Sequence, residues 1–366
     1  MSKAAELANL IGNINAGGGG VNRNVIINGA MNVAQRATSA TGKGDADGYF
    51  ACDRWHIDVG DTSAGRFTIS QDSSAPDGFA NSLKIATTTA DTSIAAGEKL
   101  VLQTKIEGQN AQTFAKGTSS AKPMALSFYV KGNASATYVA EIFDENDRQC
   151  SKTFNVTTDW TRIKLSFPAD TTGTLDDDNA TSLFINFHLH GGSNFTSGTL
   201  NSSAFASVTQ ANRAVGISSI YDSTARTFFI TGVQLEVGQN CTEFEHEPFD
   251  VTLRKCHRYF EKQIYQGGSY VHVGYFYTNN GCRSVLKYKR KRAVPTFTFN
   301  NQGNVIIYHS GNNDDVPSLN YHDHSTDYAR ITIGLSGETT TAGYAGAVYN
   351  DVASGTTYDI KIDAEL

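Results

Sequence analysis

The stretch Trp160-Thr161-Arg162-Ile163-Lys164-Leu165-Ser166-Phe167 indicates the fold class of this chain. The odd positions from 161 to 167 are mostly apolar, and the even positions from 162 to 166 are polar. Side chains that alternate with a period of two belong to a strand with one buried face and one exposed face. The stretch therefore predicts a β-strand at the surface of a packed sheet.

Several further stretches have strand character, among them 24–27, 66–69, 124–130 and 184–189. Clusters of Gly, Asn and Asp, such as 131–133 and 144–147, separate these stretches and are typical of turns. The whole chain contains 34 glycines and only 6 prolines. Many short strands with turn signals and almost no helix predict an all-β protein, with a jelly-roll β-sandwich over residues 21–250.

The first twenty residues predict one short helix and a hinge. Its apolar stripe has helical spacing and consists of Leu7, Leu10, Ile11 and Ile14. A helix this short is marginal alone in water, so we expect the stripe to serve attachment or oligomerisation. The run Gly17–Gly20 then predicts a flexible joint. A helix folded back on its own domain is the alternative interpretation.

A second short helix, with Asp250 as its cap and an apolar stripe from Leu253 to Phe260, predicts a domain boundary. Strand patterns resume after it, so residues 251–366 are expected to hold this linking helix and a second, small β-sandwich. Twelve of the chain's 16 tyrosines lie from Tyr259 onward. The tyrosine-rich part of the chain is thus predicted to be a separate β-domain.

The composition argues against several classes of partner. The formal net charge is −6, whereas binding to nucleic acid or to an anionic membrane favours a basic excess. No apolar run approaches the ~20 residues that span a bilayer, and the N-terminus has no secretory-signal pattern. The five cysteines are widely spaced without a CxxC pair, so we expect buried, reduced thiols.

Four landmarks follow one another after Gly20. They are NVIINGAM (24–31) with Asp53-Arg54-Trp55, SFYVKG (127–132) with Asp159-Trp160, ITGVQLEVG (230–238) leading to CHRYF (256–260), and RAVPT (292–296) with the terminal DAEL (363–366). Together they resemble structural proteins of tailed bacteriophages, particularly tail-fibre and particle-associated proteins. The resemblance implies a jelly roll similar to carbohydrate-binding modules, followed by a small C-terminal β-domain. It carries no catalytic residues.

Three functions follow as hypotheses. The first is a non-enzymatic structural protein of a phage particle, assembled in the host bacterial cytoplasm, fibre-like or decorating, with other virion proteins as partners and a trimer as the favoured homo-oligomer. The second is a module that adheres to bacterial surface polysaccharide. A polysaccharide-degrading enzyme is a third, weaker alternative, because no catalytic motif is present.

The basic run from Lys287 to Arg292 is the strongest charge block. If it were extended, Lys287, Lys289 and Lys291 would share one face and could bind phosphate or uronate groups. Protection of an edge strand and contact with an acidic subunit are the alternatives. The candidate residues for glycan or partner binding are Tyr275, Tyr277, Lys287, Tyr288, Lys289, Arg290, Lys291 and Arg292.

Other candidate groups receive a structural interpretation. Trp55 and Trp160 could stack on sugars, but both are expected in the core. The pairs His188/His190 and His322/His324 are expected on solvated faces, because two histidines without a third ligand make a weak metal signal. Acidic turns such as 144–147 are also expected to be solvated. We expect no metal and no cofactor.

Overall fold

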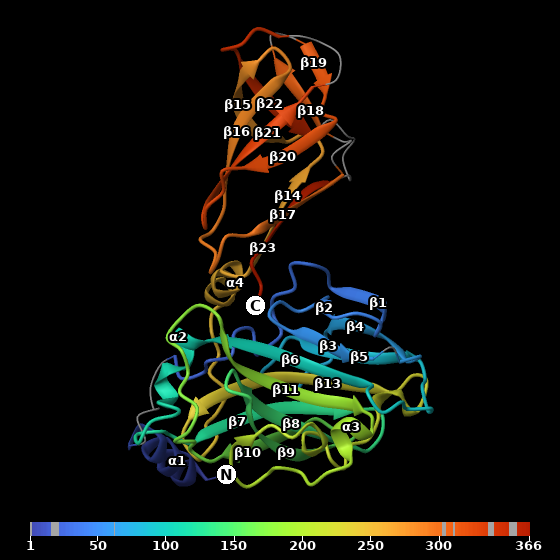
Figure 1. Cartoon of the computed structure of the whole chain (residues 1–366), viewed down its shortest axis with the longest axis vertical. Helices are drawn as coiled ribbons and strands as arrows, with labels where there is room; N and C mark the ends of the chain where they lie inside the picture. The colour runs from blue at the N-terminus through green and yellow to red at the C-terminus, as the bar shows by residue number, and fades with distance from the viewer. Residues whose placement is uncertain are drawn as a thin grey trace. The chain divides into compact units, whose positions relative to one another are not determined.

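The computed structural model describes residues 2–15, 22–61, 63–301, 305–309, 312–335, 340–350 and 357–366 (Figure 1). The protein is an all-β chain, as predicted, and it divides into two compact units. The first unit comprises residues 1–253 with Leu366, and the second comprises residues 254–365. The sequence had placed this boundary between residues 250 and 251.

The first unit is a sandwich of two antiparallel sheets. Its six-stranded sheet has the order β1 (Ser39–Lys43), β4 (Arg66–Asp72), β5 (Ser82–Thr89), β13 (Thr227–Val237), β7 (Met124–Gly132) and β10 (Thr161–Phe167). Its seven-stranded sheet has the order β12 (Ala206–Ser207), β9 (Arg148–Val156), β8 (Ala136–Asp144), β11 (Thr181–Gly191), β6 (Lys99–Glu107), β3 (His56–Gly60) and β2 (Gly48–Tyr49).

The helical elements are few and short. They are α1 (Lys3–Asn15), α2 (Gly108–Ala111), α3 (Ser193–Thr196), α4 (Phe249–His257) and the 3-10 turns η1 (Gln112–Phe114), η2 (Gln210–Asn212) and η3 (Ile220–Asp222). The linking helix begins and ends earlier than the sequence predicted. Pro248 immediately precedes α4, and its carbonyl accepts hydrogen bonds from the N–H groups of Val251 and Thr252, which sets the start of the helix.

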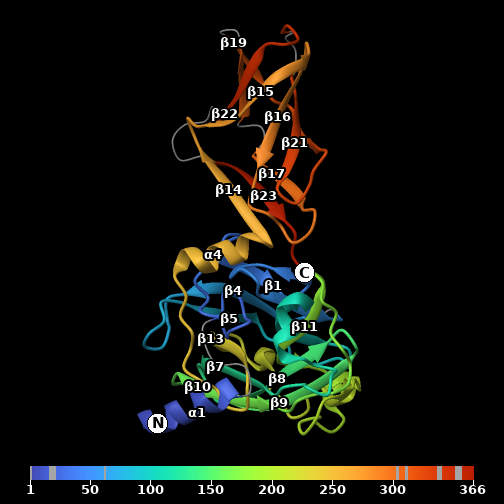
Figure 2. The same ribbon diagram turned by 90° about the vertical axis from the view of Figure 1, so that its left-hand side faces the viewer.

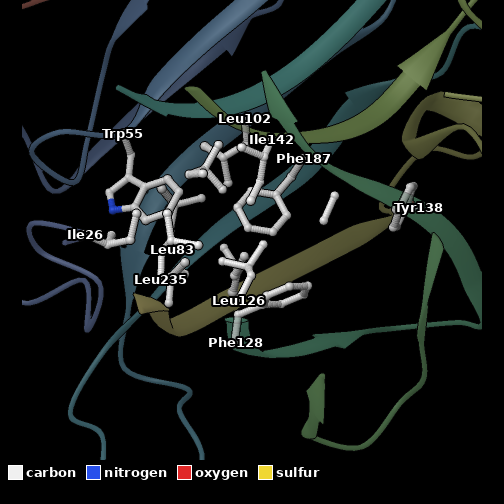
Figure 3. Packing of buried hydrophobic residues seen from close by; sticks show 14 of the residues in the cluster. Ile26, Trp55, Leu83, Leu102, Leu126, Phe128, Tyr138, Ile142, Phe187 and Leu235 are labelled. Carbon is white, nitrogen blue, oxygen red and sulfur yellow. The ribbon is translucent and has the colours of Figure 1, made fainter. Parts of the chain in front are cut away.

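The core of the first unit lies between its two sheets (Figure 3). The alternation predicted for the opening stretch is confirmed, because Phe167 is buried and Leu165 packs against the core, whereas Lys164 and Ser166 are exposed. Trp55 is fully buried, with its ring centroid 6.2 Å from that of Phe187, and its indole N–H donates to the carbonyl of Asn28. Burying a side chain of this size contributes about 3 kcal/mol of stability.

Helix α1 presents part of its apolar stripe to solvent. Leu7 is 57% exposed and Ile11 is 48% exposed, whereas Leu10 is half-buried and lines a pocket with Cys241 and Thr242. The side chain of Ile14 and the run Gly17–Gly20 lie outside the described residues. The role of the stripe in attachment or oligomerisation therefore remains a prediction.

The second unit contains two antiparallel sheets. The three-stranded sheet has the order β14 (Phe260–Gln266), β23 (Thr357–Asp363) and β17 (Thr296–Asn300). The seven-stranded sheet has the order β19 (Asn312–Asp315), β18 (Val305–His309), β22 (Ala345–Asn350), β15 (Tyr270–Thr278), β16 (Gly281–Lys287), β21 (Tyr328–Gly334) and β20 (Ser318–His322). Figure 2 shows β15, β16 and β21 as neighbours in this sheet. The core of the second unit is built from buried residues such as Phe276, Ile307, Ile331 and Tyr358.

The five cysteines are buried and form no disulfide, as predicted. Burial raises the pKa of the Cys241 and Cys282 thiols to about 11, so both remain protonated near neutral pH. No helix in the described ranges is long and apolar enough to cross a membrane.

Candidate functional site

One face of the seven-stranded sheet in the second unit is open and rich in tyrosine. On β15, Phe276 is fully buried, whereas its neighbours Tyr275 and Tyr277 are 52% and 36% exposed. The strand thus places alternate side chains in the core and on the surface. We call this surface the tyrosine face; its largest apolar members are Tyr270, Val273, Tyr275, Tyr277, Val285, Tyr308 and Tyr328.

These seven are half of the 14 large hydrophobic side chains that are exposed among the described residues. Scattered exposed apolar side chains are normal in a soluble protein, but a concentration on one sheet face marks a site of interaction. The tyrosine face is therefore the leading candidate for a functional surface.

Strand register determines how the rings are arranged. Ala347 on β22 pairs with Tyr308 on one side and with Val273 on the other, and Ala345 pairs with Tyr275. The methyl side chains of the alanines rise little above the sheet, so they leave a space between Tyr308 and the side chains of β15. At the end of this strip the rings of Tyr270 and Tyr349 lie 5.3 Å apart.

Two inward-facing glycines, on β15 and β22, allow close packing beneath the tyrosine face. A Cβ at Gly346 would lie 2.8 Å from the ring of Phe276 and 2.9 Å from Ile307. A Cβ at Gly274 would lie 2.1 Å from the carbonyl oxygen of Arg283. Only glycine fits these positions without moving the neighbouring strand.

The tyrosine face carries three cations on β16 and β21. Arg283 has its Cζ 3.9 Å from the ring centroid of Tyr277, a cation–π contact. Arg330 forms a 2.9 Å ion pair with Asp323, whose side chain is 71% exposed. Lys287 is exposed and pairs across the strands with Tyr328. The face therefore combines an aromatic half with a cationic half.

The structure distributes the predicted binding residues over different environments. Tyr275, Tyr277 and Lys287 lie together on the tyrosine face. Lys289 and Arg290 are exposed in the loop that follows β16, and Arg292 is half-buried there. Whether any of these residues contacts a ligand remains a prediction.

The basic run is not one extended strand, which corrects the predicted lysine face. Strand β16 ends at Lys287, and Lys291 is buried with its Nζ 2.9 Å from Oε2 of Glu261. Burial opposes ionisation of Glu261, but the Lys291 ammonium and several hydrogen bonds outweigh it and lower the pKa of this carboxyl. Lys291 therefore balances a buried charge and cannot meet an external ligand.

Tyr288 is also removed from the candidate surface. It is 8% exposed, and its hydroxyl donates to the carbonyls of Ser325 and Tyr328 at 2.8 and 2.9 Å. Arg283 and Arg330, in contrast, were missed by the sequence analysis. Each stands alone in its strand, and only pairing of the strands brings the two arginines together.

The predicted solvated histidines of the first unit are buried. His188 Nε2 lies 3.1 Å from Glu141 Oε2, and His190 Nε2 lies 3.1 Å from Glu98 Oε2. Burial lowers the pKa of His190 despite its carboxylate partner. No group of three or more metal-ligating side chains occurs among the residues that the structure describes.

The outer face of the seven-stranded sheet in the first unit is covered by the chain itself. Arg213, from the segment 192–222, donates from Nη2 to Oε2 of Glu141 at 2.7 Å. Asn186 also donates to Glu141, at 2.8 Å, and the side chains of Glu141 and Asn186 are almost fully buried. The Oγ of Ser219, from the same segment, lies 2.8 Å from Nδ1 of His190. This face is consequently occupied by an internal polar network.

Two other structural expectations need correction. Trp160 is half-buried on the outer side of the six-stranded sheet, with its ring 6.1 Å from that of Phe229, because even positions of its strand face outward. Of the two tryptophans, only Trp55 lies in the core. Asp144 is buried in an ion pair with Lys116, which also lies 3.0 Å from Asp170, so this turn is not simply solvated.

Comparison with known proteins gives no family assignment. No family model and no curated protein matches the chain. Among solved structures, a family 11 carbohydrate-binding module from Clostridium thermocellum, in complex with a beta-1,3-1,4-mixed-linked tetrasaccharide, is similar at 13% identity and a TM-score of 0.27, over 57% of this chain and 99% of that one.

A putative sugar binding protein from Bacteroides thetaiotaomicron is similar at 12% identity and a TM-score of 0.31, over 58% of this chain and 99% of the other. TmCBM61 in complex with beta-1,4-galactotriose is similar at 10% identity and a TM-score of 0.30, over 59% and 99%. Scores of this size carry no argument about function, which has to come from the residues of this chain.

Proposed function

We propose that this chain is a non-enzymatic glycan-binding protein and that the tyrosine face is its binding surface. The observation that carries this proposal is the concentration of exposed tyrosine rings on one open sheet face. The C–H face of a sugar ring packs on an aromatic ring, and the tyrosine hydroxyl can exchange hydrogen bonds with sugar hydroxyls. Tyrosine does so at low cost in side-chain entropy.

The arrangement of the rings supports a chain-like ligand rather than a single sugar. Exposed rings occur on β18, β15 and β21, which are separated in the sheet by β22 and β16. Neighbouring strands lie about 4.8 Å apart, so rings two strands apart are about 10 Å apart, which spans about two sugar units. An oligosaccharide crossing the strands would meet several rings in succession.

A wider setting for this activity is the phage-particle appendage predicted from the sequence landmarks. The exposed Leu7 and Ile11 on α1 favour an attachment surface outside the tyrosine face. In that setting α1 attaches or trimerises the protein within the virion, and the tyrosine face binds the bacterial surface. Locating the chain in a density map of intact particles would test this role.

The binding proposal is tested by titrating the full chain with purified bacterial surface polysaccharides. Tyr275→Ala and Tyr308→Ala should each weaken binding about tenfold, since one stacking contact contributes about 1.4 kcal/mol. The matched control is Tyr344→Ala, which should change affinity less than twofold. Tyr344 is 52% exposed, as is Tyr275. Its carbonyl accepts a hydrogen bond from the N–H of Phe276, whose side chain faces the core, so Tyr344 is not a member of the tyrosine face.

Two results would contradict the proposal. Polysaccharide cleavage in the same mixtures, measured as released oligosaccharide, would show an enzyme. If no polysaccharide binds, and Tyr275→Ala and Tyr308→Ala instead shift the oligomeric state in sedimentation, the tyrosine face is a subunit interface.

A further inference from the structure

We infer that the tyrosine face selects acidic glycans, with Arg283 and Arg330 binding carboxylate or phosphate groups of a polymer whose sugar rings stack on the neighbouring tyrosines. This inference rests on the proposed function and specifies its ligand class. It is carried by the positions of the cations and not by the basic run at 287–292.

The register places the two arginines on the same face. Arg283 pairs with Tyr275 on β15 and with Thr332 on β21, and Arg330 pairs with Val285 on β16 and with His322 on β20. Arg283 and Arg330 are therefore diagonal neighbours on adjacent strands, at a spacing of about 7–8 Å. The two side chains then diverge, since the Arg283 guanidinium lies over Tyr277 on β15 and the Arg330 guanidinium contacts Asp323 just after β20, so each arginine would engage an acidic group of its own.

Arg283 is held in a defined orientation. Its guanidinium lies over Tyr277 at 3.9 Å, and its Nε is buried without a hydrogen-bond partner among the described residues. The Nε of Arg330 is also buried and unpartnered there. A guanidinium presents its donors as a planar fork that matches carboxylate and phosphate oxygens. The Nε atoms are shielded from solvent, so a ligand would be met by the terminal Nη groups of Arg283, which have no hydrogen-bond partner among the described residues.

The cations are not explained by protection of a sheet edge. Lysine and arginine often blunt exposed edge strands, but the edges of this sheet are β19 and β20. Strands β16 and β21, which carry Arg283, Lys287 and Arg330, are interior. Edge protection therefore does not account for these cations.

Charge complementarity points to an anionic ligand. The chain as a whole has a net charge of −6, which repels polyanions. Among the outward positions of the described strands of this sheet, Asp315 on β19 is the one carboxylate, and it lies at the edge away from β16 and β21. Asp323, just after β20, pairs with Arg330, which leaves Arg283 and Lys287 as the cations of this face without a carboxylate partner among the described residues.

The test uses one polymer with and without its charge. Polygalacturonate and its fully methyl-esterified form share a backbone but differ in carboxylate charge. The full chain should bind polygalacturonate at least tenfold more tightly, and raising NaCl from 50 to 500 mM should remove most of this difference. Phosphomannan, compared with its dephosphorylated form, distinguishes phosphate from carboxylate as the acidic group.

The variants assign the selectivity to residues. Arg283→Met keeps an unbranched chain over Tyr277 and should reduce polygalacturonate affinity about tenfold, with binding of the esterified polymer unchanged. Arg283→Lys should be intermediate, because it retains the charge without the fork. The matched control is Arg254→Met, which removes an exposed arginine from α4 and should change either affinity less than twofold.

Several outcomes would overturn the inference. Equal binding of the charged and uncharged forms of both polymers refutes it and leaves the proposed function intact, whereas absence of binding to these polymers and to the bacterial surface polysaccharides refutes both. Equal competition by an oligothymidylate of similar charge would show a general polyanion surface. A loss of esterified-polymer binding in Arg283→Met, with thermal unfolding unchanged, would make Arg283 a support for Tyr277 and not an acid-binding residue.

Discussion

The two units each contain a seven-stranded antiparallel sheet, but the outward faces of these sheets have opposite fates. In the first unit, Glu141, Asn186 and His188 are almost fully buried beneath a segment that returns over the sheet. In the second unit, Tyr275 and Tyr308 remain about half exposed. Whether an outward sheet face is accessible therefore depends on the segments that cover it and not on its residue types.

The covered face is polar because its charges are paired internally. Burial alone would raise the pKa of Glu141, but Arg213 and His188 outweigh it and hold the pKa of this carboxyl well below its usual range. The charge of Glu141 is thus balanced within the chain, without a ligand. On the open face, Arg283 contacts the ring of Tyr277 but has no carboxylate partner among the described residues, so its charge is available to a ligand.

The largest expected effect comes from breaking the covered network. Arg213→Met leaves Glu141 buried without its main countercharge and should destabilise the first unit by about 3–5 kcal/mol. Both tryptophans of the chain, Trp55 and Trp160, lie in this unit, so tryptophan fluorescence during urea unfolding reports it selectively.

Arg283→Met on the open face provides the contrast, with an expected change in unfolding free energy below about 0.5 kcal/mol. The unfolding of the second unit can be followed by tyrosine near-UV circular dichroism. Equal destabilisation by the two substitutions would contradict the distinction between a covered structural face and an open functional face.

A second prediction concerns acid stability of the second unit. Burial lowers the pKa of His272 to about 4, from an ordinary value near 6.5. The imidazole is neutral in the folded state, so its contribution to stability is complete above pH 6.5 and is lost as the pH falls toward 4. The second unit should lose about 3 kcal/mol over this range from this residue.

His272→Leu should flatten this pH dependence, measured by urea unfolding at pH 7 and pH 4. His322→Leu, which replaces an exposed histidine of the same sheet, is the control and should leave the slope unchanged. An unaltered slope in His272→Leu would show that another group dominates the acid transition.

The smallest effect on stability is expected at α1, the one described helix of the first unit with exposed leucine and isoleucine. Replacing Leu7 and Ile11 together by Gln should change unfolding of the first unit by less than about 0.5 kcal/mol, because both side chains are about half exposed. Oligomeric state, measured by light scattering, should fall if this stripe joins subunits. Unchanged assembly, in solution and in particles, would remove the predicted role of α1.

The sequence by itself predicted the all-β class, the short N-terminal helix, the burial of Trp55 and of the cysteines, and the concentration of tyrosines in the C-terminal part. These features follow from local patterns, because a period of two indicates a strand and turn residues separate one strand from the next. The positions of Tyr275 and Tyr277 on one face follow from the same period.

Only the tertiary structure decided which faces are covered and which strands are neighbours. Arg213 contacts Glu141 across 72 residues of sequence, and Lys291 contacts Glu261 across 30. The burial of Glu141 and of Lys291 could therefore not be predicted from the neighbouring sequence. Arg283 and Arg330 become neighbours through the pairing of β16 with β21. The physical reason is that alternation states which side chains share a face, whereas register and the path of distant segments determine what that face meets.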